Sequence, residues 1–526
     1  MPNKEVSKIN LTYLLVLSGY SLLVFLLNAT AYEWPAIDMF SFFERYYNSE
    51  YLENDFFTNA ITSEPNPRWI FGYLIISIAS FFNIHFYVAI FYLKVIMVVT
   101  FPVVCYFMVY SFVKKYIIKD RLKYVQIIIF CSVLFVMNPK VSGIFSIAWW
   151  MPYFIQVTAQ NVSLYLGFLA IVIKEVSWHS KELNFLAIVL FLLSVFIHPI
   201  VGLFVIIFFC LLNFSHIIKE YKYFISFLFI TCLIPFTIVK TLFSPEIVLS
   251  TKEFIDIYVY KSHASHYHLS QFGSHISLNW IYSFTLMLVL MLVPLIYFYM
   301  KKQKKIILLN LLLISSYLFS VLFQYIFIDI FPSKSIAIIG PVRFTQFAYW
   351  MIVILWVIMF SRIKIIDKLN FNLIISKSLF FLVFVIYFLL GTIFLDDYKK
   401  GVHGKNIAIH RFVSTTDEKS VFASFLGDLT KDIPNIYDRA IFIGNGFPFS
   451  ESFFQEYEMR RELLYGDTGN EFYRSIKPKD FLNIAKRYRL DYIIIELQYS
   501  KQFEGNTPVF ENKKIKIYKI NDLKVR

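Results

Sequence analysis

Two carboxylates stand out in the polar stretch 28–84, which lies between apolar runs near the start of the chain. Asp38 sits among apolar neighbours in "EWPAIDMF", and Asp55 precedes two phenylalanines in "NDFF". A carboxylate in such surroundings can have a raised pKa and accept a proton from an attacking hydroxyl. Both residues are therefore candidate catalytic bases. For Asp55, helix N-capping or a pair with Arg68 is the structural alternative.

Positively charged side chains occur near the ends of several apolar runs. Lys94 lies inside "AIFYLKVIMVV"; such a charge usually faces a partner or a cavity, although a lysine can also extend to the membrane surface. Arg343 opens "GPVRFTQFAYW", where a guanidinium could bind phosphate or simply anchor a span. His198 is a further candidate for phosphate binding. His198 precedes a proline, so closing a turn is its structural alternative.

Four histidines lie close together in "YVYKSHASHYHLSQFGSHISLNW", namely His263, His266, His268 and His275. Imidazole is a common metal ligand, but this spacing fits no standard structural site and few carboxylates are nearby. Binding of a phosphate or a sugar hydroxyl by Lys261, His266 and His268 is the favoured interpretation. An ordinary interfacial loop is the alternative. We therefore predict no metal site and no cofactor, with a divalent metal as the disfavoured possibility.

Other catalytic signatures are missing from the sequence. It contains no Walker motif, no Ser-His-Asp grouping and no metalloprotease motif, and "GNGFP" at 444–448 is typical of a turn. The four cysteines all lie in apolar runs, where a thiol behaves as a small hydrophobic group. A disulfide framework and a zinc site are both disfavoured.

The composition predicts a protein that crosses a membrane many times. The chain has 526 residues, of which 58% are hydrophobic, and its mean hydropathy is +0.60. Soluble domains are less apolar. The net charge of +14 falls mostly in short loops, which favours membrane orientation over nucleic-acid binding. Twelve apolar runs are candidate spans: 11–27, 68–82, 86–112, 124–138, 159–173, 184–197, 199–214, 223–242, 277–299, 306–331, 342–361 and 373–394.

Basic residues in the loops decide which runs cross. If all twelve crossed, the basic cluster at 114–123 would lie outside, against the positive-inside rule. The short run 68–82 follows two prolines, so we expect an interfacial helix there. This leaves eleven spans, with the N-terminus cytoplasmic and the C-terminal part extracytoplasmic. The runs 184–197 and 199–214 predict a tight hairpin that points outward.

Residues 395–526 are polar and predict a small extracytoplasmic α/β domain after the membrane domain 1–394. Helices are expected at 417–432 and 478–489. Strands are expected at "AIFIG" (440–444), "ELLYG" (462–466), "DYIIIEL" (491–497), "PVFEN" (508–512) and "KIKIYKI" (514–520), with a hairpin turn at "ENKK".

The layout resembles the GT-C superfamily of membrane glycosyltransferases. The shared features are a first span, a long outer loop with an acidic residue (here Asp38), and a proline-led interfacial helix in "EPNPRWIFGYLI". About eleven spans and an extracytoplasmic C-terminal domain complete the resemblance. The segments "HPIVGL", "HYHLSQF", "GPVRF" and "DYIIIE" are similar to an uncharacterised bacterial GT-C-like family.

The resemblance implies an enzyme of the bacterial inner membrane that builds cell-envelope polysaccharide. A sugar would pass, with inversion, from a polyprenyl-phosphate donor to a glycan or lipid acceptor at the outer face. Asp38 or Asp55 would be the base, and Arg68, Lys94, Arg343 and the histidine loop would stabilise the leaving phosphate. Metal-dependent members carry a second acidic motif in the next outer loop, but 138–156 contains no acid. An O-antigen-type polymerase and a non-enzymatic transporter or scaffold are the alternatives.

Overall fold

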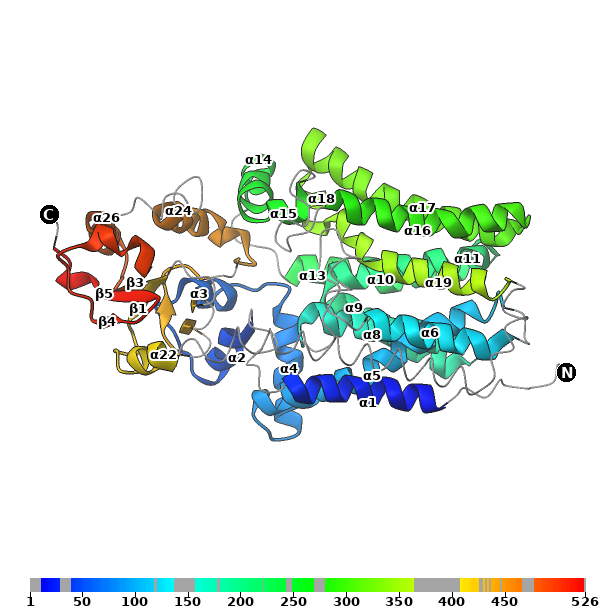
Figure 1. Cartoon of the computed structure of the whole chain (residues 1–526), viewed down its shortest axis with the longest axis horizontal. Helices are drawn as coiled ribbons and strands as arrows, with labels where there is room; N and C mark the ends of the chain where they lie inside the picture. The colour runs from blue at the N-terminus through cyan, green and yellow to red at the C-terminus, as the bar shows by residue number, and fades with distance from the viewer. Residues whose placement is uncertain are drawn as a thin grey trace. The chain divides into compact units, whose positions relative to one another are not determined.

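The computed structural model (Figure 1) describes most of the chain. The described residues are 11–28, 39–117, 121–136, 157–176, 180–219, 221–242, 248–268, 280–363, 407–424, 429–430, 433–434, 437–444, 447–465 and 477–524. Asp38, His275, the predicted span 373–394 and the loop 138–156 lie outside them. The expected domain boundary at 394/395 also lies outside, so that boundary stays a prediction.

The chain divides into two compact units, and each combines segments that are distant in sequence. The bundle unit comprises Met1–Pro35, Tyr87–Lys240 and Val259–Val402. The loop unit comprises Ala36–Phe86, Thr241–Tyr258 and His403–Arg526. The first outer loop of the sequence analysis therefore packs with the C-terminal segment.

Five helical stretches among the described residues are long and apolar enough to cross a membrane: Phe86–Val113, Ile225–Leu242, Trp280–Met300, Lys304–Ile330 and Lys334–Phe360. Each overlaps one of the predicted runs, which confirms a mostly helical membrane protein. The total of eleven spans stays a prediction.

The bundle unit is helical throughout its described part. Its helices are α1 (Leu11–Asn28), α5 (Phe86–Val113), α6 (Leu122–Val136), α8 (Ala159–Val176), α9 (Lys181–Ile197), α10 (Pro199–Leu212), α11 (Phe214–Lys219), α12 (Tyr221–Leu228), α13 (Ile234–Leu242), α15 (Ala264–Tyr267), α16 (Trp280–Met300), α17 (Lys304–Tyr325), α18 (Lys334–Ile339) and α19 (Ala348–Phe360). Wider π-helical turns cover Phe229–Leu233 and Ile326–Ile330, and a 3₁₀ helix covers Pro341–Phe347. A further π-helical turn, Ile255–Ser262, begins in the loop unit and ends in the bundle unit.

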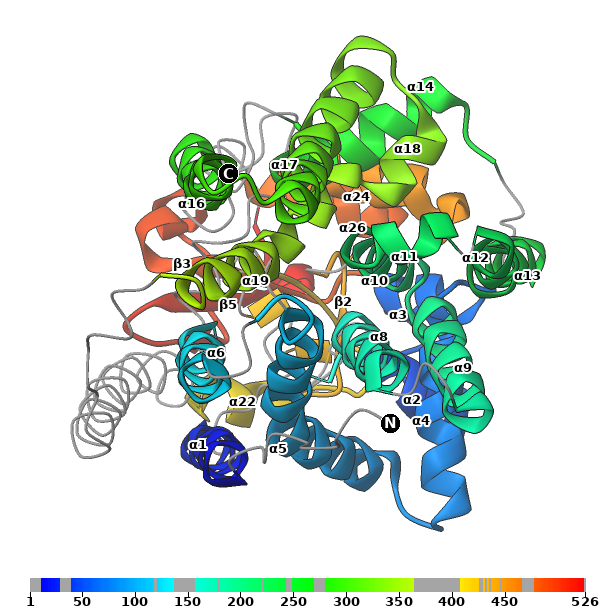
Figure 2. The same cartoon turned by 90° about the vertical axis from the view of Figure 1, so that its right-hand side faces the viewer.

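Helix α19 forms the core of the bundle unit. In the membrane-length apolar stretch within Lys334–Phe360, which contains α19, 94% of the residues are buried. Figure 2 shows α8, α9 and α10 side by side, and α16 beside α17. The Trp350 ring lies 5.8 Å from Phe168 of α8, edge to face. A helix that is apolar all round fits such a central place, because every face meets another helix.

The predicted hairpin at His198–Pro199 is confirmed. His198 ends α9 and caps α10, where its Nδ1 accepts the Val201 N–H at 3.3 Å. Gly202 allows the two helices to meet closely, because a Cβ there would lie 2.5 Å from the Val195 Cα. The direction in which the hairpin tip points stays a prediction.

Residues predicted to lie on the inner side meet at one end of the bundle unit. Lys115 forms an ion pair with the fully buried side chain of Glu175 and donates to Asn213 Oδ1 at 3.0 Å. Arg121 donates to the Ser361 carbonyl oxygen at 2.8 Å. The basic cluster at 114–123 therefore does more than orient the chain, since two of its members tie helix ends together.

The loop unit carries a five-stranded sheet in the order β2-β1-β3-β5-β4. Its strands are β1 (Val421–Ser424), β2 (Ala440–Ile441), β3 (Tyr492–Glu496), β4 (Phe510–Glu511) and β5 (Ile515–Lys519). β1 lies parallel to β2 and β3, whereas β5 is antiparallel to β3 and β4. The expected strands at 440–444, 491–497, 508–512 and 514–520 and the "ENKK" hairpin are confirmed.

Two sequence predictions for this unit are wrong. The expected helix at 417–432 contains strand β1, whose four residues are all buried between parallel neighbours. The expected strand at 462–466 is the end of helix α24 (Phe454–Tyr465). Ion pairs of Arg460 with Glu456 and of Arg461 with Glu458, four and three residues apart, fit that helix. Helix α26 (Pro478–Arg487) matches the expected helix at 478–489.

The remaining helices of the loop unit include α2 (Phe40–Tyr47), α3 (Phe56–Thr62), α4 (Trp69–Phe81), α14 (Thr251–Phe254) and α22 (Ile407–Ser414). The helix expected at 68–82 is confirmed as α4, although its lying in the interface stays a prediction. Gly72 lets α4 pack against α2, because a Cβ there would meet the Phe42 ring at 2.4 Å.

Candidate functional site

A buried arginine at the entrance to the central helix anchors the candidate site in the bundle unit. Arg343 is only 7% exposed, and its guanidinium carbon lies 4.9 Å above the centre of the Tyr267 ring. The contact joins the 3₁₀ helix before α19 to the histidine segment around α15. Two of the regions singled out from the sequence thus meet.

The turn that delivers Arg343 depends on a glycine. Gly340 has a backbone φ of +61°, which residues with a side chain rarely adopt. A Cβ at this position would also lie 3.1 Å from the Arg343 Cδ. The Arg343 N–H donates to the Gly340 carbonyl oxygen at 2.9 Å. The tight turn therefore fixes the direction in which the guanidinium leaves the backbone.

Helix α17 links the two segments through one buried amide. Gln324 is fully buried; its Nε2 donates to the Tyr267 carbonyl oxygen at 3.5 Å, and its Oε1 accepts the Val342 N–H at 3.4 Å. A single side chain therefore holds Tyr267 beside the Arg343 turn. Gln324 could not be selected from the sequence, because a polar residue in an apolar run gives no sign of its partner.

An acidic residue that the sequence analysis did not select joins the cluster. The Asp329 Oδ1 lies 3.6 Å from the His268 Nδ1, and the Asp329 side chain is 14% exposed. The nearby Tyr260 hydroxyl donates to the Ile328 carbonyl oxygen at 3.1 Å. A lone acid near the end of an apolar run was the available signal for Asp329.

The other predicted residues of this segment flank Tyr267. His266 is half-buried, and its ring lies 6.0 Å from that of His263. Lys261 is exposed at the end of the π-helical turn Ile255–Ser262. The structure thus brings Arg343 together with the segment that carries His266 and His268, as the phosphate-binding hypothesis requires.

The remaining predicted cations lie elsewhere in the chain. Lys94 lies within α5, and His198 caps α10. Arg68 belongs to the loop unit, where its guanidinium carbon lies 5.1 Å from the Phe449 ring centre. Their roles in phosphate binding stay predictions.

Asp55 is almost fully buried in the loop unit, at 1% exposure. Its Oδ2 accepts the Thr58 N–H at 2.7 Å and caps α3, while its Oδ1 accepts the Ile441 N–H of β2 at 2.9 Å. Burial raises the pKa of Asp55, although these two hydrogen bonds and the Arg460 charge oppose the shift. The alternative of helix capping is therefore realised, and the carboxylate also holds a strand from the far end of the chain.

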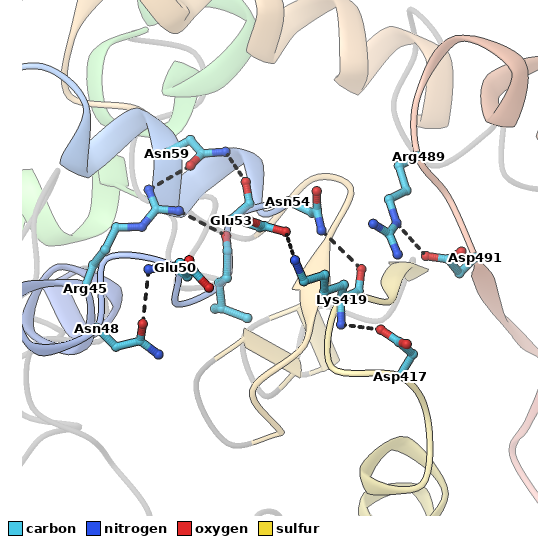
Figure 3. Close-up of polar contacts among 11 residues, drawn as sticks. Arg45, Asn48, Glu50, Glu53, Asn54, Asn59, Asp417, Lys419, Arg489 and Asp491 are labelled. Atoms are coloured by element: carbon cyan, nitrogen blue, oxygen red, sulfur yellow. Dashed lines mark hydrogen bonds and ion pairs between the residues drawn. The ribbon is translucent and has the colours of Figure 1, made fainter.

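Further polar contacts join the first loop to the C-terminal segment (Figure 3). Glu53 forms an ion pair with Lys419 at 2.7 Å, and the Asn54 side chain donates to the Lys419 carbonyl oxygen at 3.3 Å. Within the loop, Arg45 donates to Asn59 at 2.7 Å. These contacts explain why the first loop belongs to the same compact unit as the sheet.

Metal ligands do not cluster in the described part of the chain. Within it, no group of three or more His, Cys, Asp or Glu side chains could hold an ion. Asp38 and His275 fall outside that search, so the prediction of no metal site stays a prediction.

No family model matches this sequence, and no curated protein matches it. Among solved structures, the chain is similar to the crystal structure of the Archaeoglobus fulgidus oligosaccharyltransferase in complex with Zn and sulfate. The TM-score is 0.44 and the identity 12%, over 92% of this chain and 68% of that one. A likeness at this TM-score carries no argument about activity, so function must be argued from the residues.

Proposed function

We propose that the protein is a membrane glycosyltransferase of the GT-C type that uses a polyprenyl-phosphate sugar as donor. The acceptor is a glycan or lipid of the bacterial cell envelope, and transfer takes place at the outer face of the inner membrane. The observation that carries the proposal is the contact between the Arg343 guanidinium and the Tyr267 ring, which places Arg343 beside the histidine segment.

A buried guanidinium suits a phosphate that arrives on a lipid. Arg343 is held by a glycine turn and by Tyr267, so little freedom remains to be lost when it binds. A guanidinium can make two parallel hydrogen bonds to phosphate oxygens, which a flexible lysine cannot. His266 and His268 follow along the same segment and supply further donors.

The reaction needs one base and a site for the leaving phosphate. The acceptor oxygen forms a bond to the anomeric carbon from the side opposite the phosphate, and the bond from that carbon to the phosphate oxygen breaks. The hydroxyl proton passes to Asp38. Asp55 is less suited to this role, because both of its oxygens already accept backbone N–H groups. Arg343, His266 and His268 stabilise the charge released on the phosphate.

Transfer by the purified chain in proteoliposomes tests this proposal. With a panel of polyprenyl-phosphate sugars and an envelope-lipid acceptor, the wild type should release polyprenyl phosphate. Asp38→Asn should lower the rate by roughly 10² to 10⁴-fold, as expected for loss of a base. Arg343→Ala should lower it by roughly 10² to 10³-fold, as expected for loss of an oxyanion donor.

Two further variants make the test specific. Arg343→Lys keeps the charge but loses the paired geometry, so it should stay well below the wild type. Arg411→Ala removes an exposed arginine in α22 of the loop unit and should leave the rate unchanged. Full activity in Arg343→Ala would contradict the proposal, and full activity in Asp38→Asn would remove Asp38 as the base.

A further inference from the structure

Asp329 has no role in the transfer reaction as described so far. It is the single acidic residue in the apolar stretch Lys304–Ile330, and such residues are costly and usually functional. Its carboxylate is largely shielded and faces His268. A residue in this position calls for a physical reason.

The two oxygens of Asp329 have different surroundings. Oδ1 lies 3.6 Å from the His268 Nδ1, whereas Oδ2 is buried and has no hydrogen-bond partner among the described residues. Leaving a carboxylate oxygen unsatisfied is unfavourable. The contact with His268 leaves one buried oxygen of Asp329 unsatisfied, so packing alone gives no reason for an acid at this position.

The backbone at this point is also unusual. α17 changes into a π-helical turn at Ile326–Ile330, and the Phe331 N–H donates to the Ile326 carbonyl oxygen at 2.7 Å. A π turn rotates the following side chains relative to a regular α-helix, and such turns are frequent at functional sites. Here the turn contains Asp329, the residue that contacts the histidine segment.

We propose that Asp329 is a positioning residue for His268, and that the pair directs the imidazole to the leaving phosphate of the donor. This inference rests on the proposed function. The Asp329 carboxylate lies 3.6 Å from Nδ1 and attracts the ring through its charge, as carboxylates commonly orient histidines. In the imidazolium form both ring nitrogens carry hydrogen, so Nδ1–H faces Asp329 while Nε2–H donates a hydrogen bond to the phosphate oxygen as its bond to the anomeric carbon breaks. The acceptor proton still passes to Asp38, so the pair orients and binds without taking that proton.

A double-mutant cycle on the full chain in proteoliposomes tests the pairing. Asp329→Asn and His268→Gln should each lower kcat/KM for the donor by roughly 10 to 100-fold, because a small misplacement of a binding group has effects of this size. The double variant should lose no more than the larger single loss, since both changes remove one interaction. Asp329→Glu should recover part of the rate.

A control and a second readout separate positioning from folding. Glu182→Gln changes an exposed acid in the first turn of α9 and should leave kcat and KM unchanged. Binding of polyprenyl phosphate alone should weaken by about the same factor in Asp329→Asn and His268→Gln, again without further loss in the double variant. All variants should elute as the wild type does in detergent.

The possible failures are distinguishable. If the wild type transfers no sugar, the proposed function is contradicted. The binding of polyprenyl phosphate to the single and double variants then tests the Asp329–His268 pairing by itself. If the wild type transfers sugar and Asp329→Asn transfers it at the same rate, the inference is overturned while the proposed function stands. Losses that add in the double variant also overturn it, because independent contributions mean that Asp329 does not act through His268.

Discussion

The two units of this chain use charged side chains in different ways. In the loop unit, Asp55 and Glu64 reach segments that lie 386 residues away in sequence: Asp55 accepts the Ile441 N–H, and Glu64 accepts the Ser450 hydroxyl. In the bundle unit, the Lys115–Glu175 pair lies at helix ends while apolar side chains fill the centre.

This difference indicates what each kind of charge does for the fold. In the loop unit, polar contacts select which distant segments pair, because the sheet alone does not specify the partner of the first loop. In the bundle unit, apolar packing selects the partners. A buried charge in the bundle unit destabilises the fold once its partner is lost. Four predictions would test this comparison.

The largest effect is expected in the bundle unit, at Lys115→Met. The Glu175 side chain is fully buried, so the loss of its cation should lower the free energy of unfolding by about 3–5 kcal/mol. Thermal unfolding of the purified chain in one detergent checks this. The double variant with Glu175→Met should recover most of the loss, and Lys181→Met, at an exposed lysine of α9, should show none. Equal losses in the single and double variants would contradict the account.

The next largest effect is expected in the loop unit, at Asp55→Ala. The change leaves the Thr58 and Ile441 N–H groups without their acceptor, and loss of a cap and of a buried partner together should cost about 2–3 kcal/mol. Amide hydrogen exchange should become faster at both residues. Glu418→Ala, at an exposed neighbour of the sheet, is the control. Unchanged exchange at Ile441 would mean that Asp55 does not hold the strand.

A smaller effect is expected from pH, with opposite signs for two acids of the same loop. Burial raises the pKa of Asp55, so the folded chain keeps this proton where the unfolded chain has released it. Its contribution to stability therefore falls as the pH rises from about 4 through the folded-state pKa. The hydrogen bond and charge of Lys419 lower the pKa of Glu53, so its contribution is lost as the pH falls.

Melting curves across this pH range separate the two acids. Asp55→Asn should remove the component that falls with rising pH, because an amide does not titrate there. Glu53→Gln should remove the component that falls with decreasing pH. A wild type and an Asp55→Asn variant with parallel pH profiles would show that the Asp55 pKa is the same in the folded and unfolded chains.

The smallest effect is expected at the exposed pair Glu53–Lys419. Both side chains are solvated, with exposures of 41% and 58%, and such pairs contribute little because water and salt screen them. Lys419→Met should leave the melting temperature unchanged within error at 0.5 M salt. A large drop there would mean that surface charge, rather than the buried Asp55 contacts, joins the loop to the sheet.

Much of the architecture can be predicted from local patterns. Long apolar runs predict α5 and α16, and His198–Pro199 predicts the hairpin, because length and a helix-breaking pair are local signals. Strand β1 and helix α24 were predicted wrongly. The short buried run at β1 lies between two parallel neighbours that are distant in sequence. Helix α24 carries ion pairs three and four residues apart, and an apolar pattern does not reveal either feature.

The candidate site shows the same limit. Arg343 and the histidine segment could be selected from residue type, and the structure brings them together. Gln324 and Asp329 could not be given partners from the sequence, because Tyr267 lies 57 residues from Gln324 along the chain. The capping role of Asp55 could be expected from the sequence, but its second donor, the Ile441 N–H, could not, because that residue lies in a strand near the other end of the chain.

The most direct test of the central claim is the stoichiometry of transfer in proteoliposomes that hold the wild-type chain. The account predicts that polyprenyl phosphate and glycosylated acceptor appear in equal amounts, with inverted configuration at the anomeric carbon. It also predicts that both products are lost together in Arg343→Ala. Failure to release polyprenyl phosphate from any donor of the panel, or an Arg343→Ala variant with full activity, would contradict it.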